Sequence, residues 1–236
     1  FTLLITILLL LSMGLVMVLS ASSPSALSES GNSYAFFSKQ LIFAILGIIA
    51  MLFISKIDYR FYKKFYKHAW WIALILLALV LIAGRTVNGA KRWIFVTETL
   101  SFQPSEVVKI LMIIFYAGIL VKNRDELGLY TKGFIKNMCL LAPIIGLLLL
   151  EPHFSASIVI IGICATMMIM AGCKFWHFLA TGAVAGIPAM ILLIVKEPYR
   201  LQRVITFLDP WKDATGDGWQ VIQSLYAIGS GGLFGV

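Results

Sequence analysis

The sequence RTVNGAKRWIFVTETLSFQPSEVVK, residues 85–109, separates two long apolar runs in a chain where only 13% of the residues are charged. Its charged residues are four cations and two acids: Arg85, Lys91, Arg92, Lys109, Glu98 and Glu106. A helix needs about 20 mainly apolar residues to cross a bilayer. A polar stretch between two such runs therefore predicts a loop that joins two membrane helices.

The end of this stretch predicts the start of a helix. Pro104 is suited to the first helical position, because an N–H there has no partner within the helix. Glu106 falls in the first turn, where the helix dipole favours a carboxylate, and Lys109 lies three residues further on the same face. The helix continues as the apolar run ILMIIFYAGILV. Charged side chains at the start of a membrane helix are energetically costly unless they pair or face a polar cavity. Two interpretations therefore stand: a capping ion pair, or a site for an anionic ligand.

The composition is that of a polytopic membrane protein. Of the 236 residues 60% are hydrophobic, and the mean hydropathy is +0.94. In such a protein the net charge of +8 concerns topology and anionic lipids rather than nucleic acid. The three cysteines show no C-x-x-C spacing and the three histidines lie far apart, so we expect neither a disulfide nor a metal site. Motifs typical of nucleotide binding or zinc hydrolysis do not occur in the sequence.

Seven apolar stretches are predicted to be membrane spans: residues 2–20, 37–55, 69–84, 104–121, 138–150, 154–172 and 178–195. Residues 21–36 are rich in Ser and Gly and are predicted to form a polar loop. We therefore divide the chain into a membrane part, residues 1–195, and the start of a large amphipathic loop, residues 196–236. Because the sequence begins inside an apolar run and stops in a Gly-rich stretch, we expect it to be part of a longer protein.

Positive charges assign the sides of the membrane. The loops 56–68, 122–137 and 173–177 hold ten of the 19 Lys and Arg residues, which is typical of the cytoplasmic side. On the opposite side the cations gather in residues 85–109 and 196–212. Cations placed against the topological preference indicate an electropositive outer cleft, and a phosphate or pyrophosphate is their natural partner. Ordinary contacts with lipid headgroups are the alternative.

Four segments together resemble the SEDS family of FtsW, RodA and SpoVE proteins: NGAKRWI (88–94), FQPSEVVKI (102–110), EPHFSAS (151–157) and LDPWKDATGDGWQVIQSLYAIGSGGLFGV (208–236). The resemblance covers nearly the whole chain, and NGAKRWI favours the division and sporulation branch over RodA. It implies an all-α, multi-pass protein of the bacterial plasma membrane with ten helices. This chain would contain the first seven helices and the start of a large extracellular loop.

The resemblance also implies site residues. Arg92 and Trp93 match the Arg-Trp pair of the family's outer loop, and Glu106 and Lys109 match its functionally important Glu and Lys. The matches in the extracellular loop are Asp209, Gln220, Gln223 and Ser224. The aspartate proposed as catalytic in the family is expected beyond Val236. No catalytic residue is therefore assigned here, and residues 1–236 alone are expected to be inactive.

The corner EPHFSAS departs from the family's usual PD(L/F)GT, because His153 occupies the place of the aspartate. We interpret His153 as a structural residue. The alternative is that its ring substitutes for the aspartate as a hydrogen-bonding group. Glu151 is the nearest acid available to compensate for the lost carboxylate.

The function that the resemblance implies is polymerisation of lipid II into glycan strands for cell division or cell-wall synthesis. Cations would stabilise the leaving undecaprenyl pyrophosphate, a role for Arg92 and Lys109, joined by Arg200 or Arg203. A lipid II flippase and a non-catalytic division scaffold are the alternatives.

The expected partners follow from the same resemblance. They are lipid II, the bacterial membrane and a class B penicillin-binding protein, with no nucleic acid. No cofactor is evident from the sequence, and the use of a divalent cation is left open.

Overall fold

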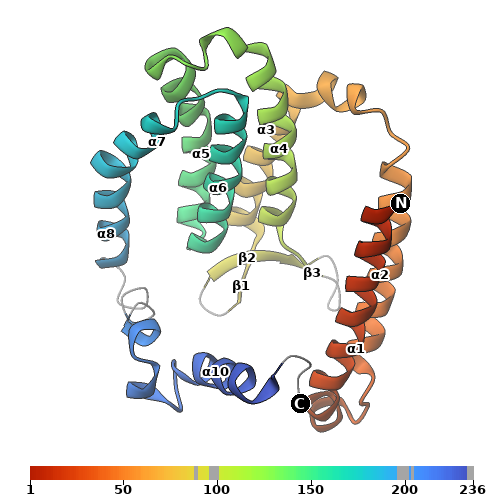
Figure 1. Ribbon diagram of the computed structural model, residues 1–236. Helices are drawn as coiled ribbons and strands as arrows, with labels where there is room; N and C mark the ends of the chain where they lie inside the picture. Colours follow the sequence, from red (N-terminus) through yellow and green to blue (C-terminus); the bar gives the residue numbers. More distant parts are fainter. Residues whose placement is uncertain (88–89, 96–100, 196–201, 203–204, 233–236) are drawn as a thin grey trace. The chain divides into compact units, whose positions relative to one another are not determined.

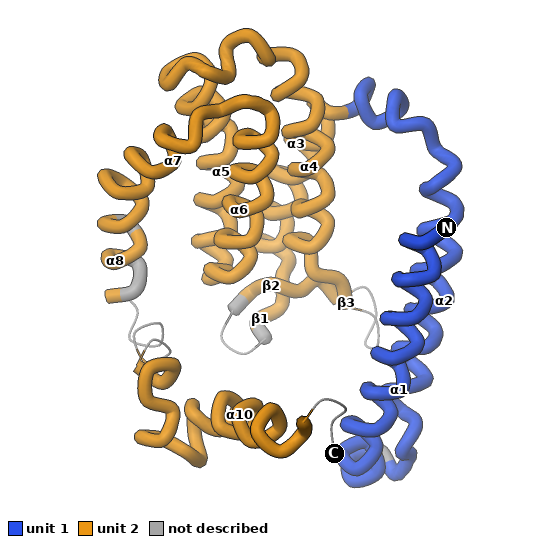
Figure 2. The backbone as a smooth tube through the Cα atoms, in the orientation of Figure 1, with its two compact units in different colours: residues 1–65 blue, residues 66–236 orange. Residues whose placement is uncertain are grey.

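The computed structural model describes residues 1–87, 90–95, 101–195, 202 and 205–232 (Figure 1). Within these residues seven helices are long and apolar enough to cross a membrane, as the sequence predicts. The protein is therefore an all-α, multi-pass membrane protein, and its described residues include a small three-stranded sheet. Contacts divide the chain into two compact units, Phe1–Phe65 and Tyr66–Val236 (Figure 2).

The first unit consists mainly of two long apolar helices, α1 (Thr2–Ser30) and α2 (Ala35–Ile54). α1 ends at Gly31, whose φ of 69° is the left-handed conformation that commonly closes a helix C-terminus. Most side chains of both helices face outward within this unit, which suits helices surrounded by lipid.

The predicted polar loop over residues 21–36 is wrong for its first part, because residues 21–30 continue α1. The hydroxyl of Ser22 donates to the carbonyl oxygen of Val18 at 2.6 Å, and other serines of this helix bond to carbonyls in the same way. Serine side chains that are satisfied within the helix do not end it.

The second unit contains the remaining helices. They are α3 (Tyr59–Ala83, which begins in the first unit), α4 (Pro104–Lys122), α5 (Lys136–Leu150), α6 (Phe154–Ala171), α7 (Phe175–Thr181), α8 (Ile187–Val195) and α10 (Trp219–Gly231). Short helical turns connect or extend them: η1 (Arg124–Glu126), η2 (Tyr130–Ile135), η3 (Gly182–Gly186) and η4 (Pro210–Asp213). Because η2 continues into α5, the fifth span is Tyr130–Leu150, longer than the predicted 138–150.

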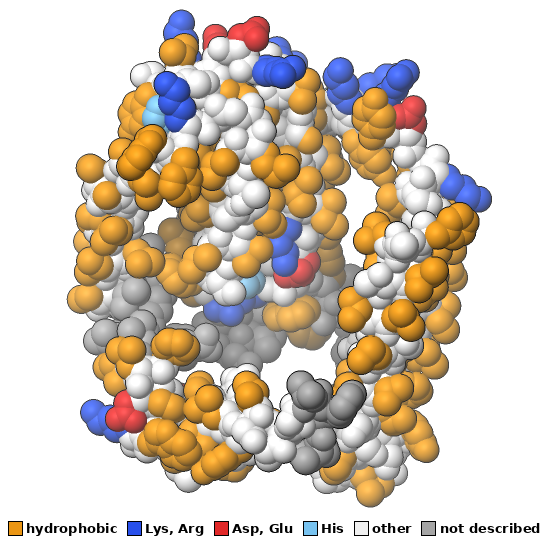
Figure 3. All heavy atoms as spheres, viewed as in Figure 1, with side chains coloured by type: hydrophobic (Ala, Val, Ile, Leu, Met, Phe, Trp, Pro, Cys, Tyr) orange, Lys and Arg blue, Asp and Glu red, His pale blue; other side chains and the backbone are white. Residues whose placement is uncertain are grey.

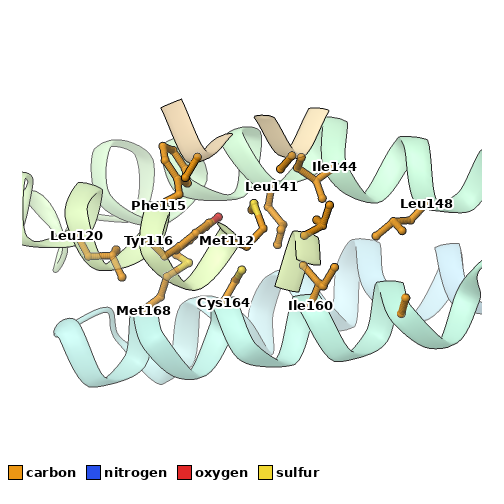
Figure 4. Close-up of a cluster of buried hydrophobic side chains, with 14 of the residues drawn as sticks. Met112, Phe115, Tyr116, Leu120, Leu141, Ile144, Leu148, Ile160, Cys164 and Met168 are labelled. Atoms are coloured by element: carbon orange, nitrogen blue, oxygen red, sulfur yellow. The ribbon is translucent and has the colours of Figure 1, made fainter. Parts of the chain in front are cut away.

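Helices α3, α4, α5 and α6 pack around one apolar core (Figure 4). The core includes Met112 and Tyr116 of α4, Ile144 of α5 and Cys164 of α6. The Tyr116 hydroxyl donates to the carbonyl oxygen of Asn137 at 2.8 Å, as a polar group buried in a membrane protein requires. This core fixes the positions of the helix ends that carry the charged residues.

The predicted loop between α3 and α4 contains three short antiparallel strands. They are β1 (Arg85–Val87), β2 (Ala90–Phe95) and β3 (Ser101–Phe102), in the order β1-β2-β3. Arg85 pairs with Trp93, and Ile94 pairs with Phe102. Since β2 contacts α4, the strand holds Arg92 and Trp93 close to the start of that helix.

Close packing of α4 against α3 predicts that Gly118→Ala is destabilising. A methyl group on Gly118 would lie 2.6 Å from Cβ and 2.7 Å from Cδ2 of Tyr66, atoms too near the backbone to move freely. We expect the free energy of unfolding to fall by about 1–3 kcal/mol, as for other overpacked cores. Thermal unfolding of the purified protein in detergent measures this effect.

Gly162→Ala on α6 is the matched control, because nothing lies within 4 Å of the added methyl group. This variant should be as stable as the wild type or slightly more stable, since Ala is the better helix former. Equal stability of the two variants would contradict close contact between α3 and α4.

Candidate functional site

Three helix ends and strand β2 bring six polar residues to one end of the α3–α6 core. We call these residues the polar cluster: Arg92, Gln103, Glu106, Lys109, Glu151 and His153. Figure 3 shows cationic, acidic and histidine side chains gathered at that end. Hydrogen bonds, one ion pair and electrostatic effects connect the members of the cluster.

The start of α4 has the predicted geometry. Pro104 occupies the first turn, and the Lys109 ammonium lies 2.7 Å from a Glu106 carboxylate oxygen. The Glu106 side chain is 57% exposed and that of Lys109 is 26% exposed, so the pair contributes little to stability, at most about 1 kcal/mol. Its effect is to orient Lys109 beside the other members of the polar cluster.

Arg92 joins β2 to the corner between α5 and α6. Its Nη2 donates to the carbonyl oxygen of Pro152 at 2.5 Å, a contact between residues 60 positions apart. Its Nε is buried and has no hydrogen-bond partner in the described part of the chain. Trp93 is the next residue along the strand, and it projects to the opposite face because successive side chains alternate.

His153 caps the N-terminus of α6. Its Nδ1 accepts from the backbone N–H of Ala156 at 3.4 Å, and its Nε2 lies 2.5 Å from the side-chain amide of Gln103. A neutral ring whose Nδ1 accepts carries its proton on Nε2. Nε2–H therefore donates, and Gln103 accepts when its amide is turned with the oxygen toward the ring.

Burial lowers the pKa of His153, and the nearby Arg92 guanidinium lowers it further. The ring is therefore neutral at pH 7, with both nitrogens engaged. This geometry supports the interpretation of His153 as a structural residue, since an aspartate at the same position would cap the same helix.

Glu151 directly follows α5 as its C-terminal capping residue and is only 1% exposed. Burial raises the pKa of its carboxyl group to about 7, and the Arg92 guanidinium lowers it in part. Its Oε1 has no hydrogen-bond partner among the described residues. Glu151 and Gln103 were not predicted as site residues. An acid directly after an apolar span was the available signal for Glu151, because ionisable residues at membrane depth are commonly functional.

The structure brings Arg92, Glu106 and Lys109 together but leaves the C-terminal site residues elsewhere. Asp209 precedes η4, while Gln220, Gln223 and Ser224 lie on α10, and all four are exposed. They make no described contact with the polar cluster. Arg200 and Arg203 lie outside the described residues. The cluster as described has the donors and the positive charges that an anionic group requires.

Comparisons with known proteins agree with the resemblance. A family model for FtsW, RodA and SpoVE, described as "Cell cycle protein", matches residues 1–236. Stage V sporulation protein E of Bacillus subtilis is 38% identical over 99% of this chain, and the alignment covers 64% of that protein. The probable peptidoglycan glycosyltransferase FtsW of Coxiella burnetii is 40% identical over 96% of this chain and 61% of its own length. The chain thus spans less than two thirds of these relatives.

Solved structures show the same fold. A chain from a peptidoglycan synthase complex that coordinates polymerization and crosslinking matches 94% of this chain and 66% of its own, with a TM-score of 0.66 and 29% identity. The rod shape determining protein RodA of Thermus thermophilus matches 77% of this chain and 58% of its own, with a TM-score of 0.59 and 26% identity.

The capping role of His153 predicts the effect of two substitutions. His153→Leu removes the acceptor for the Ala156 N–H and should lower the free energy of unfolding by about 1 kcal/mol. His153→Asp supplies another side-chain acceptor and should retain most of the stability. Thermal unfolding in detergent compares them, and a leucine variant as stable as the wild type would argue against the cap.

Proposed function

Because the chain belongs to the family of cell cycle proteins that comprises FtsW, RodA and SpoVE, we propose that the protein polymerises lipid II into peptidoglycan glycan strands. One observation carries the proposal: Arg92 and Lys109 converge with neutral hydrogen-bonding groups at one end of three membrane helices. Such a site suits a pyrophosphate that stays anchored in the membrane by a lipid chain. Relatives named as peptidoglycan glycosyltransferases support this assignment.

In this proposal the polar cluster binds the pyrophosphate that leaves the donor sugar. A sugar hydroxyl of the acceptor gives its proton to a general base outside the polar cluster and attacks the anomeric carbon of the donor, and the bond from that carbon to the pyrophosphate oxygen breaks. Negative charge grows on the pyrophosphate as it leaves, and preorganised cations stabilise that charge most in the transition state. Arg92 is held by Pro152 and Lys109 is oriented by Glu106, so both cations are in place before the reaction.

The partner that we propose is a class B penicillin-binding protein, which would crosslink the strands. The similarity to a chain of a peptidoglycan synthase complex, in which polymerization and crosslinking are coordinated, supports this assignment. The exposed apolar surfaces of the helices offer room for a further membrane helix.

Removing either cation should strongly reduce polymerisation. We expect Arg92→Ala and Lys109→Ala to lower glycan synthesis by about 100-fold or more, the usual loss when one oxyanion-stabilising group is removed. The assay uses the full-length protein, purified with its transpeptidase partner and supplied with labelled lipid II. Strand length is then read on a gel.

Lys122→Ala is the matched control, because this exposed lysine ends the same helix far from the polar cluster. It should polymerise like the wild type. Full activity of both Arg92→Ala and Lys109→Ala would rule out the cluster as the pyrophosphate site. A folded wild-type complex that makes no polymer would favour a flippase or a scaffold.

A further inference from the structure

Two buried polar atoms at the corner of α5 and α6 complement each other. Oε1 of Glu151 is an acceptor without a partner, and Nε of Arg92 is a donor without a partner, in the part of the chain that the structure describes. Nη2 of Arg92 donates a hydrogen bond to the carbonyl oxygen of Pro152, the residue that directly follows Glu151. The two side chains therefore belong to one corner, but their charged atoms are not joined by an ion pair there.

Leaving either of these buried atoms without a hydrogen-bond partner costs free energy. A buried carboxylate without a partner is strongly disfavoured, so it must either pair with a cation or take up a proton. A buried guanidinium N–H likewise needs an acceptor. Pairing with the Glu151 carboxylate would supply such an acceptor, and an anionic ligand would supply a competing one.

We propose that Glu151 and an anionic ligand compete for Arg92, so that binding of a pyrophosphate group makes Glu151 take up one proton from solvent. The proton binds the carboxylate of Glu151, and no covalent bond of the ligand changes. This inference rests on the proposed function, since it concerns the same pyrophosphate site. Glu151 is then a positioning residue for Arg92, and its carboxyl group determines how many protons the site takes up when the ligand binds.

The surroundings of Glu151 favour it over the other titratable groups of the corner. These groups are Arg92 on β2, Glu106 and Lys109 on α4, and His153 at the start of α6. Arg92 is the charged group that acts on Glu151, while Glu106 and Lys109 pair with each other. Both nitrogens of His153 are engaged in hydrogen bonds, so its ring has no free site for a further proton.

The pH dependence of binding follows from a Glu151 pKa of about 7 in the empty site. Below that pH Glu151 is already protonated, and the ligand binds without proton uptake. Above that pH Glu151 is ionised and must take up a proton before the ligand can bind. The affinity for the ligand therefore falls as the pH rises, by up to about tenfold per pH unit. An affinity that rises with pH would have the wrong sign.

Isothermal titration calorimetry of the full-length protein with farnesyl pyrophosphate tests the proposal. Between pH 7.5 and 8.5, titrations in two buffers with different ionisation heats give the number of protons taken up on binding. We expect uptake approaching one proton for the wild type and a dissociation constant that rises severalfold over this range. Glu151→Gln keeps the shape of the side chain but cannot titrate, so it should bind with no uptake and a constant affinity.

Two further variants separate the outcomes. His153→Gln should retain the uptake of the wild type, and Arg92→Ala should lose most of the binding. Uptake that persists in Glu151→Gln, or wild-type binding without uptake, overturns this inference but leaves the anion site intact. A wild type that does not bind the probe overturns the pyrophosphate site and the inference together. Lipid II polymerisation, measured on the same preparation, tells whether the proposed function survives in each case.

Discussion

The constraint on which this structure depends is that charges and unpaired backbone groups must stay out of the lipid hydrocarbon. The long helices satisfy their own backbones, and the α3–α6 core is almost wholly apolar. Charged side chains are therefore confined to helix ends and loops, where residues distant in the sequence meet. The polar cluster is the result at one end of α4, α5 and α6, and β2 adds Arg92 to it.

The cluster is arranged so that positive charge is held but not fully neutralised. Glu106 pairs with Lys109 and Pro152 anchors Arg92, while His153 is kept neutral by burial and by its two hydrogen bonds. Arg92 acts on the buried Glu151 carboxylate, and a proton on Glu151 removes that attraction. An anionic group that enters the cluster thus meets two oriented cations, which is the electrostatic requirement for stabilising a leaving pyrophosphate.

Much of the fold could be predicted because span length and apolar composition are local properties of the sequence. The pair of Glu106 and Lys109 could be predicted for the same reason, since helical spacing alone places them on one face. The short strands of residues 85–102 could not be predicted, because strands of only two to six residues carry little periodic signal in the sequence. The contacts of Gln103 with His153 and of Arg92 with Pro152 join residues 50 and 60 positions apart, and only tertiary packing brings them together.

We expect the polar cluster to face the outer side of the membrane, opposite the turn η1 that follows α4. Cysteine accessibility reports this orientation, in a background in which Cys139, Cys164 and Cys173 are replaced. Lys91→Cys, beside Arg92, should react with a membrane-impermeant maleimide in intact spheroplasts, whereas Arg124→Cys, in the exposed turn η1, should react only after the membrane is disrupted. The reverse pattern would place the cluster on the cytoplasmic side and contradict a pyrophosphate site at the outer face.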